Sequence, residues 1–448
     1  MRSLEGGTGF SLCFGCLLTK ELRELLTSRA YWLLLLMIGP LVGHAFITAV
    51  DSYAEASGRG GGPAALAQGL SPLDGILVPA FGAYDLAVTL LFPFVAIRLI
   101  SAEKESGAWK LMLQAPVSLV SMLAAKGLML IAAWFIAWTP GLAALVLWKA
   151  YGGSLYVPEL LNLLLGHLLR VILSSGVAVA AAAIANGAAS AAIATLGFTV
   201  GTWALDFVAA GRGGLLQRLA AYTPTAALRV FEQGQLRLST VLVSLILGAG
   251  GFVLAGVWLP TRRNLQTRLA GSLSAALLIA VVLWAGSLPR ANWDLSENRR
   301  NSFPPSAEAA LRQIRQPLRV TVYLAAEDPR LTDLERSILS KLERILPRVD
   351  VEYAAHTRAG LFEGAADHYG EVWYELDGRK VMSRSTTEPI VLDTLYQLAR
   401  IQPPSSAGGV EFSGHPLAAN PTGAAWILYG LWPSIIALLW WLRFRYSS

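Results

Sequence analysis

The sequence predicts an α-helical polytopic membrane protein that carries one small α/β domain. Two observations predict the membrane part: 54% of the 448 residues are hydrophobic with only 15% charged, and the mean hydropathy is +0.50. A composition of this kind is too apolar for a soluble protein. The third observation is a change in composition between residues 289 and 423, where charged residues and prolines become frequent. We therefore expect a separate domain there.

A helix needs about 20 apolar residues to cross the hydrocarbon core of a bilayer, and about eight stretches satisfy this length. No cleavable signal peptide is expected, because the first apolar run follows a long amphipathic lead that carries Lys20, Arg23 and Arg29. The stretches are 31–50, 81–100, 126–147, 161–185, 189–208, 240–259, 269–288 and 424–442.

The positions of Lys and Arg near the span ends predict the orientation, because these residues favour the cytoplasmic side. If the spans alternate, four groups of basic residues fall on one side, so we expect both termini in the cytoplasm and 289–423 outside it. Residues 211–239 are then expected as short helices at the outer interface. The four groups are Lys20, Arg23 and Arg29; Lys104 and Lys110; Arg262, Arg263 and Arg268; and Arg443 and Arg445.

The α/β domain is expected to follow the order strand, helix, strand, hairpin, helix. These elements are predicted at 318–324, 330–348, 349–355, 371–384 and 388–401, and the hairpin turns at Asp377 and Gly378. This is the order of a thioredoxin-like fold, but the segment has no cysteine, which excludes thiol exchange. The stretch "PPSSAGGVEFSGHPLAANPTG" is expected to be a flexible tether back to the membrane.

Several kinds of chemistry are absent from the sequence. No Lys is followed by Ser or Thr, so no phosphate-binding P-loop exists and no cofactor is expected. The tetrapeptide "SAEK" at 101–104 lacks the partner motifs of a Ser-Lys acyl-enzyme. The basic residues lie beside apolar spans rather than on a continuous surface, which argues against nucleic acid.

Metal binding is not expected either. His356, His368 and His415, with Asp367, lack the spacing of a metal-binding helix and are interpreted as surface residues. Cys13 and Cys16 supply only two ligands, so we interpret them as an inert pair at the membrane interface.

The segment "RLISAEKESGAWKLMLQAPVS", residues 98–118, places charged residues between the second and third spans. We expect a short helix along the membrane, with Glu103, Glu105 and Lys110 facing water. Composition alone leaves open whether the segment is a solvated connector or a docking site.

A family resemblance favours the docking site. The segment resembles the coupling segment of ABC-2 type exporter permeases, although Ala108 and Trp109 depart from its pattern. The stretches 19–32 and 222–236 resemble the interfacial lead and the outer loop of the same family, the latter through Pro224, Phe231 and Gly234. The residues of the coupling segment that fit are Glu103, Glu105, Gly107, Leu111, Leu113, Pro116 and Ser118, followed by Lys126 at the start of the third span.

Residues 293–324 are similar to the membrane-proximal entry of the auxiliary protein of gliding-motility-type ABC systems, and Asp294, Leu295, Arg299 and Ser302 carry the likeness. The auxiliary part is truncated to its first, thioredoxin-like domain. The domains expected are 1–30, a cytoplasmic lead; 31–260, a six-span permease unit; 261–288, a seventh span; 289–423, the auxiliary domain and tether; and 424–448, an eighth span and cytoplasmic tail.

The resemblance implies a transmembrane subunit of an exporter in a bacterial inner membrane. It would work as a homodimer or paired permease with two ABC ATPase subunits, which bind the ATP, through Glu103, Glu105, Gly107, Lys110 and Pro116. The alternative is an ATPase-driven module whose outer domain docks a partner protein without transport.

The fourth span carries charge at depth. His167 and Arg170 lie on one face of it, and a charge there favours a pathway, a partner subunit or a lipid headgroup. If Arg170 lines a path, Arg170→Leu should insert at least as well as the parent while transport falls.

Overall fold

The computed structural model describes residues 6–59, 69–209, 215–261, 263–325, 328–354, 368–404 and 412–445. The chain forms two compact units, each with its own core of buried apolar side chains. The first unit consists of Met1–Gly201, Ser239–Pro289 and Ser413–Ser448, and the second of Thr202–Leu238 and Arg290–Phe412.

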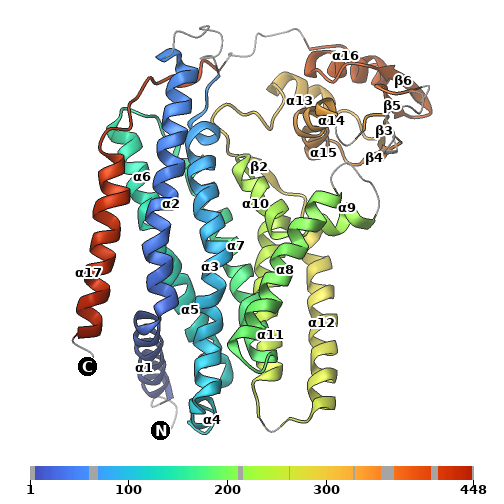
Figure 1. Ribbon diagram of the computed structural model, residues 1–448. Coiled ribbons are helices and arrows are strands. Elements are labelled where there is room, and N and C mark those ends of the chain that lie inside the picture. Colours follow the sequence, from blue (N-terminus) through green and yellow to red (C-terminus); the bar gives the residue numbers. More distant parts are fainter. Residues whose placement is uncertain are drawn as a thin grey trace, which may run out of the picture. The chain divides into compact units, whose positions relative to one another are not determined.

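The first unit is a bundle of helices (Figure 1). Its elements are α1 (Gly6–Thr27), α2 (Arg29–Ala54), η1 (Glu55–Arg59), η3 (Leu73–Leu77), α3 (Val78–Glu105), α4 (Ala108–Met112), α5 (Leu119–Ala137), α6 (Thr139–Ala150), α7 (Val157–Ile184), α8 (Ala188–Ala209, whose residues 202–209 belong to the second unit), α11 (Leu238–Trp258), α12 (Leu265–Ser287), η5 (Trp426–Leu431) and α17 (Trp432–Arg445).

The expected membrane spans are confirmed as helices. Among the described residues, 8 helices are long and apolar enough to cross a membrane, and each overlaps one predicted stretch. The third is broken at Trp138, because Pro140 starts a new helix, α6, and its ring supplies no N–H to continue α5. The spans are Arg29–Arg59, Leu73–Glu105, Leu119–Ala150, Val157–Ile184, Ala188–Ala209, Leu238–Trp258, Leu265–Ser287 and Trp426–Arg445.

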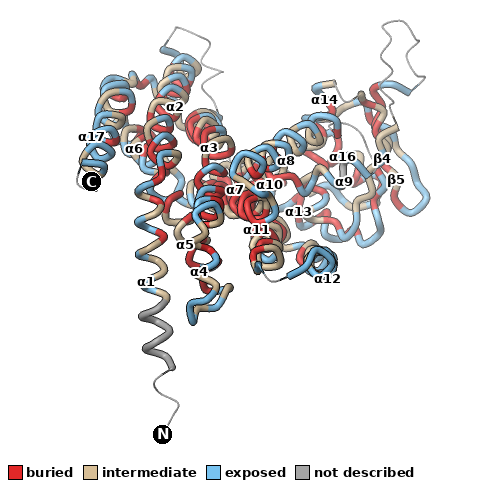
Figure 2. Tube along the Cα trace, turned by 60° about the horizontal axis from the view of Figure 1, so that its bottom comes forward, coloured by how far each residue is buried: buried red, intermediate tan, exposed pale blue. Residues whose placement is uncertain are grey.

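Burial separates central helices from peripheral ones. Figure 2 shows mostly buried residues in α3 and α7 and mostly exposed residues in α12 and α17. A helix that exposes apolar side chains over most of its surface is suited to lipid or to another membrane helix, because water would be an unfavourable neighbour. The centre of the first unit is therefore the α3–α7 pair.

The elements that carry the basic groups lie together. Figure 1 shows α1, α4, the connection between α11 and α12, and the end of α17 at one end of the first unit. The predicted basic groups belong to these elements or to the end of α3, with Arg262 outside the described residues.

The return to the last helix is not a free tether where the structure describes it. His415 donates from its backbone N–H to the Leu70 carbonyl and its own carbonyl accepts from Tyr53, at 2.9 and 2.8 Å. Arg59 donates to the Ala419 carbonyl at 2.9 Å and Tyr151 to the Thr422 carbonyl at 3.0 Å. The expectation of a flexible tether is wrong for residues 413–422, because these hydrogen bonds fix its backbone to the helix ends.

The second unit contains the predicted α/β domain and the segment before α11. Its 4-stranded sheet has the order β4-β3-β5-β6, with β3 and β4 parallel and the other neighbours antiparallel. Its elements are α9 (Leu215–Ala220), α10 (Pro224–Glu232), β1 (Gln235–Arg237), β2 (Asn292–Asp294), α13 (Pro305–Leu311), β3 (Leu318–Val322), α14 (Pro329–Leu334), η4 (Glu335–Leu339), α15 (Ser340–Ile345), β4 (Val349–Tyr353), β5 (Val372–Leu376), β6 (Arg379–Ser383) and α16 (Glu388–Ala399).

The predicted order of strand, helix, strand, hairpin and helix is observed from β3 to α16. The hairpin turns at Asp377 and Gly378, whose φ angles are 51° and 75°. Positive φ at both central residues is the geometry of a type I′ turn, which matches the twist of the strands and favours an Asp-Gly pair.

A second, 2-stranded sheet joins the segment before α11 to the start of the α/β domain. In it β1 and β2 are antiparallel, with Arg237 opposite Asn292. The Arg300 guanidinium and the Asn301 amide also donate to the Gln233 carbonyl, at 3.3 and 2.6 Å. The α/β domain is therefore bound to the connection between the fifth and sixth spans as well as to the seventh.

Asp294 organises this junction. Its carboxylate accepts hydrogen bonds from the backbone N–H of Ser296 and Asn301 and from the hydroxyl of Ser302, at 3.0, 3.1 and 2.6 Å. A turn passes through Arg299, whose φ is 49°. Two of the residues that carry the likeness to the auxiliary protein, Asp294 and Ser302, are thus the acceptor and the donor of one hydrogen bond that closes this loop.

Candidate functional site

The end of α3 carries three consecutive charged residues, Glu103, Lys104 and Glu105, and each contacts a different part of the bundle. Successive residues of an α-helix point about 100° apart, because the helix has 3.6 residues per turn. The charged end of α3 can therefore contact several helices at once.

Glu103 belongs to a buried ionic cluster. Its Oε1 lies 2.9 Å from Lys126 Nζ on α5 and also accepts from Lys20 on α1. Lys126 donates to both carboxylate oxygens of Glu21 at 2.9 Å and to the Leu99 carbonyl at 2.8 Å. The expectation that Glu103 faces water is wrong, because its side chain is only 3% exposed between α1 and α5.

The same cluster brings three acidic residues together. Ligand oxygens of Glu21, Glu24 and Glu103 lie within 4.8 Å of one another. Lys20 and Lys126 place their ammonium groups against these oxygens, so the arrangement is that of an ion-pair network. Burial lowers the pKa of Lys20, but its hydrogen bond to Glu103 and the charges of Glu103 and Glu21 outweigh burial and raise it.

Lys104 and Glu105 contact the connection between α7 and α8. The Lys104 ammonium donates to the carbonyls of Ala182, Ala183 and Ala185, at 2.9, 3.0 and 2.7 Å. The Glu105 carboxylate accepts from the N–H of Ala188 at 3.3 Å. A cation at a helix C-terminus and an anion at a helix N-terminus both stabilise the helix dipole, so the two charges match the two helix ends.

The predicted short helix after α3 is α4, which is five residues long. Gly107 starts it with φ 78°, a left-handed conformation that favours glycine. The Trp109 indole is buried and donates to the Leu259 carbonyl after α11 at 3.0 Å. Lys110 and Leu111 are exposed, and Leu111, at 69%, leaves an apolar side chain uncovered in this chain.

Pro116 is exposed in the connection between α4 and α5. Two residues later Ser118 caps α5 by accepting from the Ser121 N–H at 3.0 Å. The connection therefore ends at a defined helix start.

His167 and Arg170 lie apart from the charged end of α3. Arg170 precedes Ala182 by twelve residues of α7, or roughly 18 Å along the helix. Its guanidinium pairs with Asp85 on α3, with Nε 2.6 Å from Oδ1, and donates to the Thr89 hydroxyl at 3.1 Å. His167 Nδ1 lies 4.0 Å from the same Asp85 oxygen. The predicted pair is therefore brought together with a carboxylate between the two central helices.

The predicted site residues omitted two partners, of which the sequence signals one. Asp85 is the acidic residue within the second apolar stretch, and an intramembrane carboxylate suggests a basic partner such as Arg170. Glu21 lies on the polar face of the amphipathic lead, where nothing in its spacing distinguishes it from Glu24. Its role depends on how α1 packs against α5.

The remaining sequence candidates form no site together among the described residues. Cys16 is exposed and free, and the side chain of Cys13 lies outside the described part of the chain. His356 and Asp367 also lie outside it. The His368 ring contacts Glu371, with Nδ1 3.0 Å from Oε2.

Comparison with known proteins is informative for the membrane part. The family model described as ABC-2 family transporter protein matches residues 16–261, more than half of the 448 residues. It covers the lead from residue 16 onward, the ionic cluster, α4 and the first six spans. No curated protein and no solved structure matches the chain. The eight apolar helices in the described part of the chain make it a multi-pass membrane protein, and the chain belongs to the ABC-2 family of transporter proteins.

Proposed function

We propose that the chain is the transmembrane subunit of an ABC exporter and that α4 couples it to a separate ATPase subunit. Membership of the ABC-2 family supports a membrane transport component that works with an ABC ATPase. The observation that carries the coupling is the pair of exposed residues Lys110 and Leu111 on a helix whose other side is fixed by Trp109. This leaves one charged and one apolar side chain for a partner.

The contacts of α3 define how movement would spread. A displacement of α4 would displace the end of α3, and the ionic cluster of Glu103 would transmit this movement to α1 and α5. Lys104 and Glu105 would transmit the movement to α7 and α8, and Trp109 would transmit it to the end of α11. Buried ion pairs resist separation strongly, because breaking one leaves an uncompensated charge. The helices would therefore move together, as in rigid-body switching.

We place the substrate path at the α3–α7 pair. His167 Nε2 and Arg170 Nη1 are buried and have no hydrogen-bond partner among the described residues, so each nitrogen is available to hydrogen-bond a ligand. Opening of the Asp85–Arg170 pair, roughly 18 Å along α7 from the Lys104 contacts, would make these groups accessible while the ends of α3 and α7 stay joined. Two copies of the chain, or two related permeases, would enclose the path with two ATPase subunits.

The orientation follows from the basic groups. Their position at the end of the first unit that carries α4 supports that end as the cytoplasmic one, by the positive-inside rule. Both termini would then lie in the cytoplasm of a bacterial cell, and the α/β domain outside its inner membrane. The order of strands β4-β3-β5-β6, with one parallel pair, supports a thioredoxin-like domain of the auxiliary, gliding-motility type.

A second function is favoured by the junction between β1 and β2. The α/β domain is hydrogen-bonded to the connection that leads into the sixth span, so motion of that span would move the domain. In this alternative, the ATPase drives the domain to act on a partner protein and nothing crosses the membrane.

The test uses the chain purified with its coexpressed ABC ATPase and reconstituted in nanodiscs. Lys110→Glu combined with Leu111→Ser should lower copurification of the ATPase and its hydrolysis rate, while the chain itself inserts normally. Lys149→Glu is the matched control, because Lys149 is exposed at the far end of α6. Equal effects of the two substitutions would contradict coupling through α4.

A further inference from the structure

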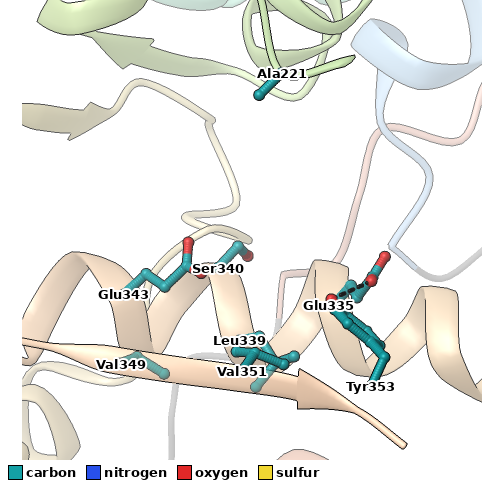
Figure 3. Close-up of a pocket in the computed structure, with 8 residues that line it drawn as sticks. All are labelled: Ala221, Glu335, Leu339, Ser340, Glu343, Val349, Val351 and Tyr353. Atoms are coloured by element: carbon teal, nitrogen blue, oxygen red, sulfur yellow. Dashed lines mark hydrogen bonds between the residues drawn. The ribbon is translucent and has the colours of Figure 1, made fainter. Parts of the chain in front are cut away.

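The α/β domain has an open cavity of about 430 Å³ beside β4. Figure 3 shows Glu335, Leu339, Ser340 and Glu343 along one helical segment, with β4 next to it and Ala221 on the other side. The floor of the cavity is apolar, and a carboxylate lies toward each end. The remaining lining residues are Val349, Val351 and Tyr353.

The cavity borders the edge of the sheet. Within the described residues β4 pairs with β3 alone. The N–H of Leu318 bonds to the Arg348 carbonyl and the N–H of Ala354 to the Val322 carbonyl. In a parallel pair, alternate residues of a strand form the hydrogen bonds to its neighbour. The even-numbered residues of β4 therefore bond to β3, and the backbone N–H and C=O groups of Val349 and Val351 point away from it. An edge of this kind accepts a further strand.

The spacing of the two carboxylates matches an extended chain. Glu335 and Glu343 are eight residues apart, which is roughly 12 Å at 1.5 Å per helical residue. Residues i and i+4 of a strand point to the same face and are about 13 Å apart. The residue between them, i+2, would lie against Leu339.

The carboxylates at the two ends of the cavity, Glu335 and Glu343, have different neighbours. Glu335 accepts a hydrogen bond from the Tyr353 hydroxyl at 2.6 Å, which leaves its negative charge uncompensated by that neighbour. Glu343 interacts electrostatically with Arg237. A cation at the Glu335 end would therefore bind more favourably than one at the Glu343 end.

We propose that this cavity binds an extended peptide segment of a partner protein as an additional strand beside β4. Its recognition pattern is a basic residue, an aliphatic residue and a second basic residue at alternate positions. The backbone pairs with Val349 and Val351, the aliphatic side chain contacts Leu339, and the basic side chains approach Glu335 and Glu343. The proposal rests on the surface of the α/β domain and not on transport by the membrane part.

The experiment measures binding of a short fluorescent peptide to the full chain in detergent by anisotropy. In the peptide, two lysines flank a valine at alternate positions between threonines. Glu335→Gln with Glu343→Gln should weaken binding about 2- to 30-fold, since exposed ion pairs contribute roughly 0.2–1 kcal/mol each. Replacing both peptide lysines by glutamate should abolish binding to the parent.

The control is Glu352→Gln, which removes one carboxylate charge from β4 itself. Glu352 is exposed and alternates with Val351, so its side chain lies on the opposite face of the sheet. It should leave peptide affinity unchanged. An equal loss in Glu352→Gln and in the double variant would reduce the effect to general charge and overturn the site.

Backbone pairing has its own test. The peptide has two alternating sets of backbone amides, and only one set faces β4. N-methylation of that set should abolish binding, and N-methylation of the other set should preserve it. If both methylated peptides bind as well as the parent peptide, or if the parent peptide does not bind at all, strand addition is wrong.

Discussion

Lys126 Nζ on α5 lies 2.9 Å from Glu103 Oε1 on α3, and both side chains are almost completely buried. Lys126→Met leaves the buried carboxylates of Glu103 and Glu21 with Lys20 as their shared cation, and Lys20 is partly exposed. Loss of one member of a buried pair costs roughly 3–5 kcal/mol, so the thermal unfolding midpoint in detergent should fall markedly. Lys20→Met should cost about 1 kcal/mol or less, because Lys20 is 33% exposed. Equal shifts for the two variants would be incompatible with the cluster as described.

The Asp85–Arg170 pair corrects the expectation for Arg170→Leu. With Asp85 2.6 Å away, removal of Arg170 alone leaves a buried carboxylate unpaired, so the variant should be less stable than the parent. Asp85→Leu should be destabilised for the same reason. The double variant should regain most of the loss, because two apolar side chains replace the whole pair. A double-mutant cycle of detergent stability measures this coupling, and strictly additive losses would exclude it.

The β1–β2 junction predicts a specific cross-link. Arg237 and Asn292 are directly opposed, and they alternate with the hydrogen-bonded pair Leu238 and Ala291. They therefore form a non-hydrogen-bonded pair, in which the side chains are closest. After replacement of Cys13 and Cys16, Arg237→Cys with Asn292→Cys should form a disulfide readily.

The register control for this cross-link pairs Arg237→Cys with Trp293→Cys. Trp293 is opposite Leu236, so its side chain lies on the other face. Mobility on non-reducing gels shows whether each double-cysteine variant has formed a disulfide. Comparable cross-linking of the two pairs would mean that β1 and β2 do not keep this register.

Asp328 predicts an acid-sensitive helix start. Hydrogen bonds from the side chain of Arg330, together with its backbone N–H and the Tyr369 hydroxyl, lower the pKa of Asp328 to about 2. A carboxyl whose folded pKa lies below its unfolded value of 3.8 stabilises the fold above that pH, and the contribution is lost as the pH falls toward 2.

Hydrogen exchange of peptides that cover α14, corrected for intrinsic rates, tests this expectation. Protection should decrease between pH 5 and pH 3 in the parent. Asp328→Asn should already be less protected at pH 5 and change little on acidification, whereas Asp333→Asn, an exposed carboxylate on the same helix, should behave as the parent. A parent whose protection is constant over this range would refute the contribution of Asp328.

Periodicity and length were sufficient for the elements and not for their contacts. The spans, the Asp377–Gly378 turn and the order of the α/β elements follow from local patterns, because each depends on residues close in sequence. The burial of Glu103 does not, since a charged residue after an apolar stretch looks the same whether it faces water or a buried Lys. Only the packing of α1 and α5 around α3 decides between them.

The departure of Trp109 from the family pattern has a structural explanation that the sequence could not supply. Its indole N–H reaches the Leu259 carbonyl, 150 residues away. A contact over that separation depends on the whole bundle. The same holds for Lys104, whose acceptors on α7 are defined only when the ends of α3 and α7 are adjacent.

The most direct test of coupling through α4 is site-specific photo-cross-linking in the native membrane. A benzophenone amino acid placed at Leu111, which is exposed on α4, should cross-link the chain to an ABC ATPase. The same group at Tyr156, exposed at the opposite end of α7, should not. A cross-link to the ATPase from Leu111 alone is the result the account predicts; no cross-link from Leu111, or an equal one from Tyr156, would contradict it.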